Sequence, residues 1–208
     1  LTSVTRMEQM FQSCAKLTTV PNINSWNTAG VTVMTSLFNG CSSFNQNIGS
    51  WNTAKVVSMQ NMFASAGSFN QNIGGWNTAA LTRTSGMFGG ASSFNQNIGN
   101  WNTAAVTMMD KMFQNATSFN QNIGNWSLNA NVDLSNMLDN SGLDCSNYSA
   151  TLVGWNANPS TPNGRSLGAA GRTYGPAATT ARANLTGTKG WTITCLLYTS
   201  PSPRDGLL

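Results

Sequence analysis

The chain has 208 residues, with ten lysines and arginines against six aspartates and glutamates, and it contains no histidine. Charged residues make up 8% of the chain, where a globular domain has about 25%, so Asn, Gln, Ser and Thr must supply most of its polar surface. The lack of histidine excludes a Ser-His-Asp triad and histidine metal ligands, and the lack of a Lys/Arg cluster argues against nucleic-acid binding. No run approaches the roughly 18 apolar residues of a membrane span, so we expect no span here.

Internal repeats dominate the sequence. Tryptophan recurs every 25 residues, phenylalanine and methionine columns keep the same period, and the segment FNQNIG recurs unchanged in four units. Because each unit of a repeat fold must fill the same interior position, these columns predict a core rather than a platform on which sugars or bases stack. The tryptophans that open the units are Trp26, Trp51, Trp76, Trp101 and Trp126. The unit before Trp26 is shortened, so the chain is expected to begin inside a repeat.

Two patterns alternate within each unit. Apolar residues from Val31 to Cys41 follow the spacing of a short amphipathic helix, for which Thr28 is the expected cap. Residues 43–48 predict a short strand with Phe44 and Ile48 on one face. One helix and one strand per unit indicate an α/β fold, a leucine-rich-repeat-like solenoid whose short strands stack in parallel. The alternative is an all-β solenoid, because the helical part is short and contains several glycines.

The repeat pattern fades after Trp126, which divides the chain into expected regions. Residues 1–142 predict the repeat solenoid, with a truncated first unit and about five coils. Residues 143–194 predict a C-terminal cap, since an open solenoid needs an atypical last unit over its apolar edge. Within the cap we expect a helix around Leu152, a loop over 158–164, a second helix over 177–185 and a closing strand from Trp191.

The pattern WNTAxVxxMxxMFxxAxSFNQNIG resembles the BspA-like leucine-rich-repeat surface proteins of bacteria, also found in some eukaryotic microbes, over about residues 1–194. The resemblance implies a secreted or cell-surface protein that takes part in adhesion or other protein contacts, with its signal and anchor outside this fragment. Residues 195–208 instead resemble a translated sequencing adaptor, so they are expected to be a non-native tail.

The cysteines and acidic residues offer little chemistry. Cys14 and Cys41 each follow the phenylalanine of their unit at the same spacing, so they are expected to stack on neighbouring units, which makes them candidates for a disulfide in an oxidising compartment. The alternative is that each merely replaces the small buried alanine of later units. No CxxC motif signals a metal site, and no unit supplies a pair of carboxylates, so we expect no metal, no cofactor and no enzymatic activity.

The remaining candidate for a binding surface is the outward face of the expected strands. Two rows of uncharged amides would line a concave sheet face and hydrogen-bond an extracellular or host protein, or sugar hydroxyls; they are Asn45, Asn47, Asn70, Asn72, Asn95, Asn97, Asn120 and Asn122. The opposite interpretation is that these rows are solvated or bond to one another. The sequence therefore favours a non-enzymatic protein-binding module, with a carbohydrate-binding module or a passive spacer as alternatives.

Overall fold

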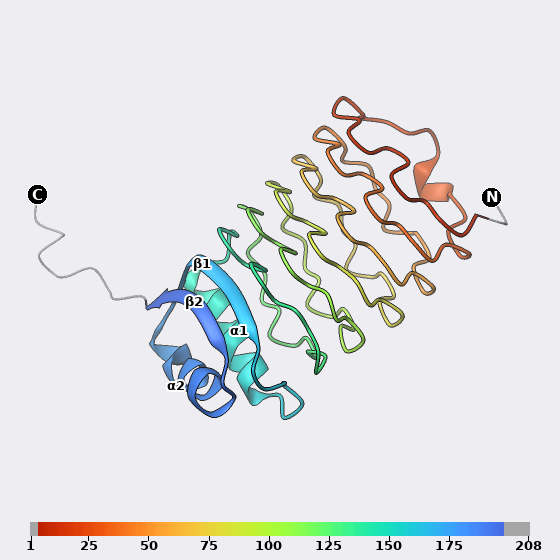
Figure 1. Ribbon diagram of the computed structural model, residues 1–208. Coiled ribbons are helices and arrows are strands. Elements are labelled where there is room, and N and C mark those ends of the chain that lie inside the picture. Colours follow the sequence, from red (N-terminus) through yellow and green to blue (C-terminus); the bar gives the residue numbers. More distant parts are fainter. Residues whose placement is uncertain (1–3, 198–208) are drawn as a thin grey trace, which may run out of the picture.

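The computed structural model describes residues 4–197. Successive repeat units lie side by side along the chain, from the N-terminal end to a region of helices and strands at the other end (Figure 1). The units are joined by single parallel β-bridges, the first of which pairs Arg6 with Val33 and the next Val33 with Ser58. The bridges continue through Arg83 and Met108 to Asp133, so each unit is paired with the next at the same position.

Backbone hydrogen bonds between units replace those within a helix. The amides of Met34, Ser36 and Phe38 donate to carbonyls of the next unit at 2.8–2.9 Å. Since these donors point along the stack, every unit satisfies its backbone only when a neighbour is present.

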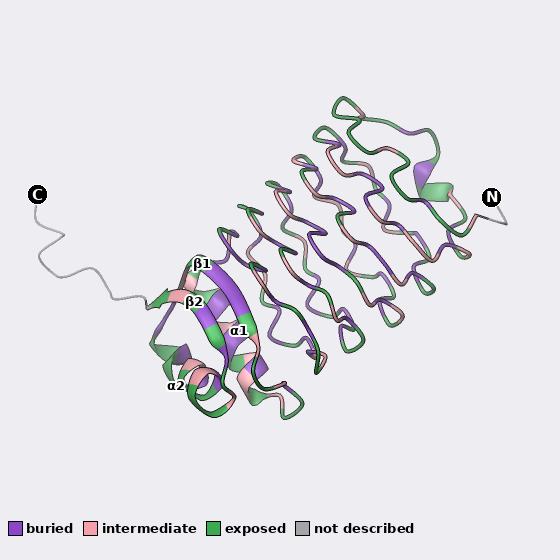
Figure 2. Ribbon diagram, viewed as in Figure 1, coloured by how far each residue is buried: buried purple, intermediate pink, exposed green. Residues whose placement is uncertain are grey.

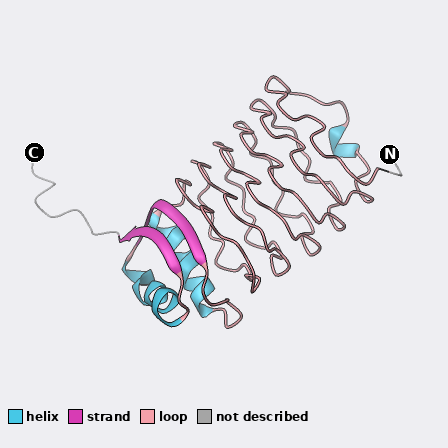
Figure 3. Ribbon diagram, viewed as in Figure 1, coloured by secondary structure: helices cyan, strands magenta, loops and turns pink. Residues whose placement is uncertain are grey.

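The helix expected over Val31–Cys41 is not formed, and that prediction was wrong. The segment is a series of tight turns, and Figure 3 shows the repeat units as loops and turns apart from a short 3₁₀ helix η1 (Ile23–Ser25), which precedes this segment. Ser36 and Gly40 have φ values of 55° and 75°, which a right-handed helix cannot accommodate. The turns bury residues three and four apart, and this spacing reproduces the apolar pattern of a helix.

The strand expected over residues 43–48 is also absent. Phe44 and Ile48 are buried as predicted, but the parallel pairing lies elsewhere in the unit, at Val33 and its equivalents. A side chain of this segment joins it to the next unit instead: Oδ1 of Asn45 accepts from the amide of Asn70 at 3.0 Å. Isolated bridges and turns therefore replace both the helix-plus-strand unit and continuous strands in residues 4–142.

The apolar columns form one continuous core. Phe38 stacks on Phe63 with ring centroids 5.8 Å apart, and the same contact recurs from unit to unit. Trp76 stacks on Trp101 at 6.4 Å, and each is only 4% exposed. Figure 2 shows buried segments running along the inside of the stack. The prediction that these columns are core rather than a binding platform is confirmed.

The helices and strands after the repeats match the expected order, with one addition. Helix α1 (Cys145–Ala157) precedes a long strand β1 (Ser166–Tyr174), which the sequence patterns did not predict. Next come η2 (Pro176–Ala178), α2 (Thr179–Ala183) and the π-helical η3 (Asn184–Thr188). Strand β2 (Thr192–Leu197) pairs in parallel with β1.

Strand β1 continues the stack of units. Leu134 of the last unit bridges to Leu167, and the amides of Leu138 and Asn140 donate to carbonyls of β1 at 2.8 Å. β1 therefore occupies the place that the next unit would take. Of the expected non-native tail, Cys195–Leu197 completes β2, and residues 198–208 lie outside the described residues.

Candidate binding surfaces

The predicted amide rows have different roles. In the inner row each asparagine joins two units, because its Oδ1 accepts hydrogen bonds from two groups of the next one. Oδ1 of Asn95, for example, accepts from the backbone amide of Asn120 at 2.9 Å and from Nε2 of Gln121 at 2.8 Å. The inner row consists of Asn45, Asn70, Asn95 and Asn120. Its oxygens are committed to the stack, as the opposite interpretation of the rows anticipated.

The outer row keeps donors for a ligand. Oδ1 of each member accepts from the glycine amide two residues later, at 2.8–3.0 Å, which fixes the orientation of the side-chain amide. Among the described residues none accepts a hydrogen bond from the Nδ2 groups, and all four residues are exposed. The outer row consists of Asn47, Asn72, Asn97 and Asn122.

The first turn of α1 ends the inner row. The amide of Asp144 and Nδ2 of Asn147 both donate to Oδ1 of Asn120 at 3.0 Å, so they replace the asparagine and glutamine of a further unit. Asp144 also caps α1, because its Oδ1 accepts from the amide of Asn147 at 2.7 Å. This bond, together with one from Nδ2 of Asn120, lowers the pKa of the Asp144 carboxyl.

Thr28 was expected to cap a helix, but it and its equivalents Thr53, Thr78 and Thr103 bond between units instead. The hydroxyl of Thr28 donates to the carbonyl of Asn52 in the next unit at 3.1 Å, and the equivalents of Thr28 repeat this bond. These threonines are buried, so they present no surface to a ligand.

Cys14 and Cys41 are free thiols in the structure, and the candidate disulfide is not formed. Cys14 is exposed, whereas Cys41 is buried and its Sγ donates to the carbonyl of Phe11 at 2.9 Å. Desolvation by burial is the main reason why the pKa of the Cys41 thiol rises to about 11. Cys41 thus occupies the small buried position that alanine fills in later units. Within residues 4–197, no group of three or more His, Cys, Asp or Glu residues is placed to hold a metal ion.

A second surface, which we call the bridge face, lies where the units pair. It consists of two rows of side chains outside the apolar core: Arg6, Val33, Ser58, Arg83, Met108 and Asp133, which make the bridges, and Glu8, Thr35, Gln60, Ser85, Asp110 and Ser135 two residues later. Arg83 and Met108 are exposed, whereas the small Ser58 and Ser85 are covered by their neighbours. Side chains contact across units, as in the hydroxyl pair of Thr35 and Ser58 at 3.0 Å. Because neighbouring units carry different residues in both rows, the bridge face is the variable side of an otherwise uniform stack.

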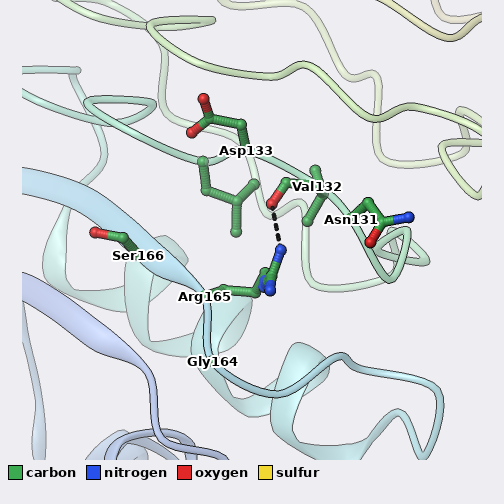
Figure 4. A pocket seen from close by; sticks show the side chains of 7 residues that line it. Asn131, Val132, Asp133, Gly164, Arg165 and Ser166 are labelled. Carbon is green, nitrogen blue, oxygen red and sulfur yellow. Dashed lines mark hydrogen bonds between the residues drawn. The ribbon is translucent and has the colours of Figure 1, made fainter.

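A cleft of about 210 Å³ lies at the C-terminal end of the bridge face, between the last repeat unit and the start of β1. Its lining residues are Asn131, Val132, Asp133, Leu134, Gly164, Arg165 and Ser166. Nη1 of Arg165 donates to the carbonyl of Val132 at 3.5 Å across the cleft (Figure 4). Arg165 was not among the predicted site residues, because it lies in a loop whose place beside the repeats depends on the unanticipated β1.

The family model described as "Mycoplasma protein of unknown function, DUF285" matches residues 1–89 and 51–155. The chain belongs to this family. DUF285 is a repeat family related to the BspA-like proteins that the repeat pattern resembles. No curated protein and no solved structure matches the chain. Within residues 4–197, none of the helices has the length and apolar character needed to cross a bilayer.

Proposed function

We propose that this chain is a non-enzymatic, extracellular or cell-surface module that binds another protein, and that its repeat units form a solenoid. Membership of a repeat family and the unit-to-unit pairing support the solenoid. Solenoids provide long surfaces on which one partner contacts several units at once. The surface location rests on the resemblance to BspA-like proteins, in which adhesion and protein contacts are implied.

The contrast between the invariant and the variable positions of the units carries the proposal. FNQNIG is identical in four units: its Phe and Ile lie in the core, its first Asn forms the inner amide row, and its second Asn closes the turn at the glycine. The bridge face meets no such uniform requirement, since Ser58, Arg83 and Met108 occupy the same position in successive units. Arginine and methionine are also enriched in protein interfaces. Positions that vary on a fixed frame are those that can specify a partner, so we assign binding to the bridge face.

A carbohydrate-binding function is the second candidate, and the outer amide row supports it. Its oriented, exposed Nδ2 groups repeat from unit to unit and suit the hydroxyl oxygens of a polysaccharide.

The test is a binding screen of the full chain against extracellular proteins and against polysaccharides, followed by two matched double variants. Arg83→Ser with Met108→Ser alters the bridge face by installing the residue that Ser58 already provides there, so the stack should tolerate it. Asn72→Asp with Asn97→Asp removes outer-row donors but keeps the oxygens that accept from Gly74 and Gly99.

We expect protein hits whose affinity falls by about tenfold or more in the first double variant, since truncating a well-packed interface residue can cost about 1–2 kcal/mol. The second double variant should bind within a factor of about two of the parent chain. The reverse pattern would move binding to the outer amide row. Hits among the polysaccharides alone would favour the carbohydrate-binding function. The absence of any protein or polysaccharide hit would favour a passive spacer.

A further inference from the structure

The cleft between the last repeat unit and β1 holds a cation, Arg165, that forms no ion pair with the described residues. Among residues 4–197, the one ion pair joins Arg6 to Glu8, with Nε and Oε2 2.7 Å apart. The guanidinium of Arg165 therefore has no ion-pair partner in the described chain. Its Nε donates to the carbonyl of Asn163 at 3.0 Å, and its Nη1 reaches the carbonyl of Val132. A guanidinium has five N–H donors, so three remain for a ligand.

The position of Arg165 is fixed before any ligand arrives. Its backbone carbonyl accepts from the amide of Thr192 at 2.9 Å, and the preceding residue, Gly164, donates to the carbonyl of Lys189 at 2.7 Å. The bond from Nε to the carbonyl of Asn163 then limits the rotation of the side chain, with a smaller contribution from the longer contact of Nη1 with Val132. Because the ordering of a long side chain is already achieved, less conformational entropy is lost when the guanidinium binds an anion.

The carboxylate of Asp133 also lines the cleft but is directed elsewhere. One of its oxygens accepts from the amide of Ser135 at 2.9 Å, and Figure 4 shows the carboxylate turned away from Arg165. Ser166 and Asn131, which line the same cleft, supply uncharged polar groups. The cleft thus combines one free cation with a nearby negative charge, which favours a singly charged anion over a doubly charged phosphate.

We propose that this cleft binds the carboxylate of an aspartate or glutamate side chain on the partner protein, with the Arg165 guanidinium as its main contact. The planar guanidinium matches a carboxylate in a two-bond arrangement. The volume of about 210 Å³ is enough for one acidic side chain. This inference rests on the proposed function, since the cleft continues the bridge face beyond Asp133.

The experiment uses a small probe, so that it does not depend on the unidentified partner. N-acetyl-aspartate α-amide, which carries one carboxylate, is titrated into the ¹⁵N-labelled full chain. The Arg165 Nε–H signal and the Ser166 amide should shift together and saturate. Arg165→Gln should weaken binding by about tenfold or more, and Arg165→Lys should recover only part of the loss because it lacks the planar pair of donors.

Two controls complete the test. Lys55→Gln removes an exposed cation elsewhere on the repeat units and should leave the affinity unchanged within a factor of about two. Asp133→Asn should tighten binding about two- to threefold, because it removes a like charge beside the bound carboxylate. Thermal melts of each variant establish that the fold is kept.

Equal loss of affinity in Lys55→Gln and Arg165→Gln, or the absence of saturable shifts at Arg165, would overturn the proposal. Tighter binding of glucuronate than of the aspartate probe would overturn the assignment to a protein side chain, and tighter binding of inorganic phosphate would overturn the assignment to a carboxylate. If the titration fails while the binding screen gives protein hits, only the assignment of a ligand to the cleft is overturned. A screen without protein hits would overturn the proposed function.

Discussion

Individual amide side chains connect the repeat units where the backbone does not. Asn95 receives two hydrogen bonds from the next unit, whereas Asn97 in the outer row only closes a turn within its own unit. Both side chains are exposed, so a difference in their contribution to stability would reflect their bonding and not their burial. Each inner-row asparagine thus acts as a connector, and this role accounts for the constancy of the first asparagine of FNQNIG in four units.

Replacing Asn95 with Ala should lower the free energy of unfolding by about 1–2 kcal/mol, because the Asn120 amide loses its acceptor and Gln121 keeps only its bond to the backbone carbonyl of residue 95. Asn97→Ala should cost roughly half as much, since only one local bond is lost. Urea denaturation followed by Trp fluorescence measures both. Asn95→Asp keeps an acceptor and should be milder than Asn95→Ala; equal losses in the two Asn95 variants would contradict the connector role.

The thiols of Cys14 and Cys41 should differ in reactivity. Because burial raises the pKa of Cys41 to about 11, it should remain unmodified by iodoacetamide at about pH 8 while exposed Cys14 is alkylated. The raised pKa stabilises the native state below the ordinary thiol pKa of 9.0, and this contribution is lost as the pH rises through about 11. Peptide mass spectrometry of the native chain reads out the modification. A Cys14–Cys41 disulfide would instead leave both unmodified until a reductant is added.

At the scale of elements, helix α1 ends the inner amide row and is fastened to it by Asp144. Since hydrogen bonds lower the Asp144 pKa, this residue stabilises the native state above the unfolded carboxyl pKa of about 4, and the contribution disappears as the pH falls through the lower native value. Unfolding midpoints of the parent chain should therefore fall below about pH 4, and those of Asp144→Asn should fall less. Identical pH profiles for the two chains would show that Asp144 is not responsible.

Close backbone contact holds α1 against the stack. A Cβ added at Gly154 would lie 2.5–2.7 Å from the backbone of Gly124, so Gly154→Ala should destabilise the chain by about 1–3 kcal/mol. Gly75 has open space and is the matched control, since other units carry Ser or Asn there. Gly75→Ala should leave the stability unchanged or raise it by up to about 1 kcal/mol. Urea midpoints for the two variants measure the difference, and equal midpoints would show that α1 can move away from Gly124 at no cost.

The success of the sequence predictions depended on what each pattern encodes. Periodic spacing identified the core columns and α1, because burial repeats wherever a unit or a helical turn repeats. The same spacing gave the wrong prediction of a helix over Val31–Cys41, because turns with positive φ at Ser36 and Gly40 bury the same positions as a helix. β1 was missed because its sequence, SLGAAGRTY, lacks strand-forming residues at most positions. Its strand form comes from pairing with the last unit and β2, and a tertiary contact of this kind also places Arg165.

At the scale of the whole molecule, stability depends on contacts between neighbours. Each repeat unit pairs with the units on either side, and the pairing passes through Leu134 into β1 and then into β2. The units share one core, because the phenylalanine and tryptophan columns run from each unit into the next. Disruption at one end should therefore expose the apolar edge of the next unit and weaken the array from that end.

A chain that ends at Gly142 should be less stable and should self-associate. The truncation removes β1, whose carbonyls accept from Leu138 and Asn140, and so leaves these two amides unpaired beside an uncovered apolar edge. We expect the thermal midpoint to fall by about 10 °C, since 1 kcal/mol corresponds to roughly 2–4 °C in a chain of this size. A chain ending at Leu197 is the matched control, because it keeps every described residue. Light scattering after size exclusion measures association, and a monomeric Gly142 chain with an unchanged midpoint would show that the array needs no C-terminal cover.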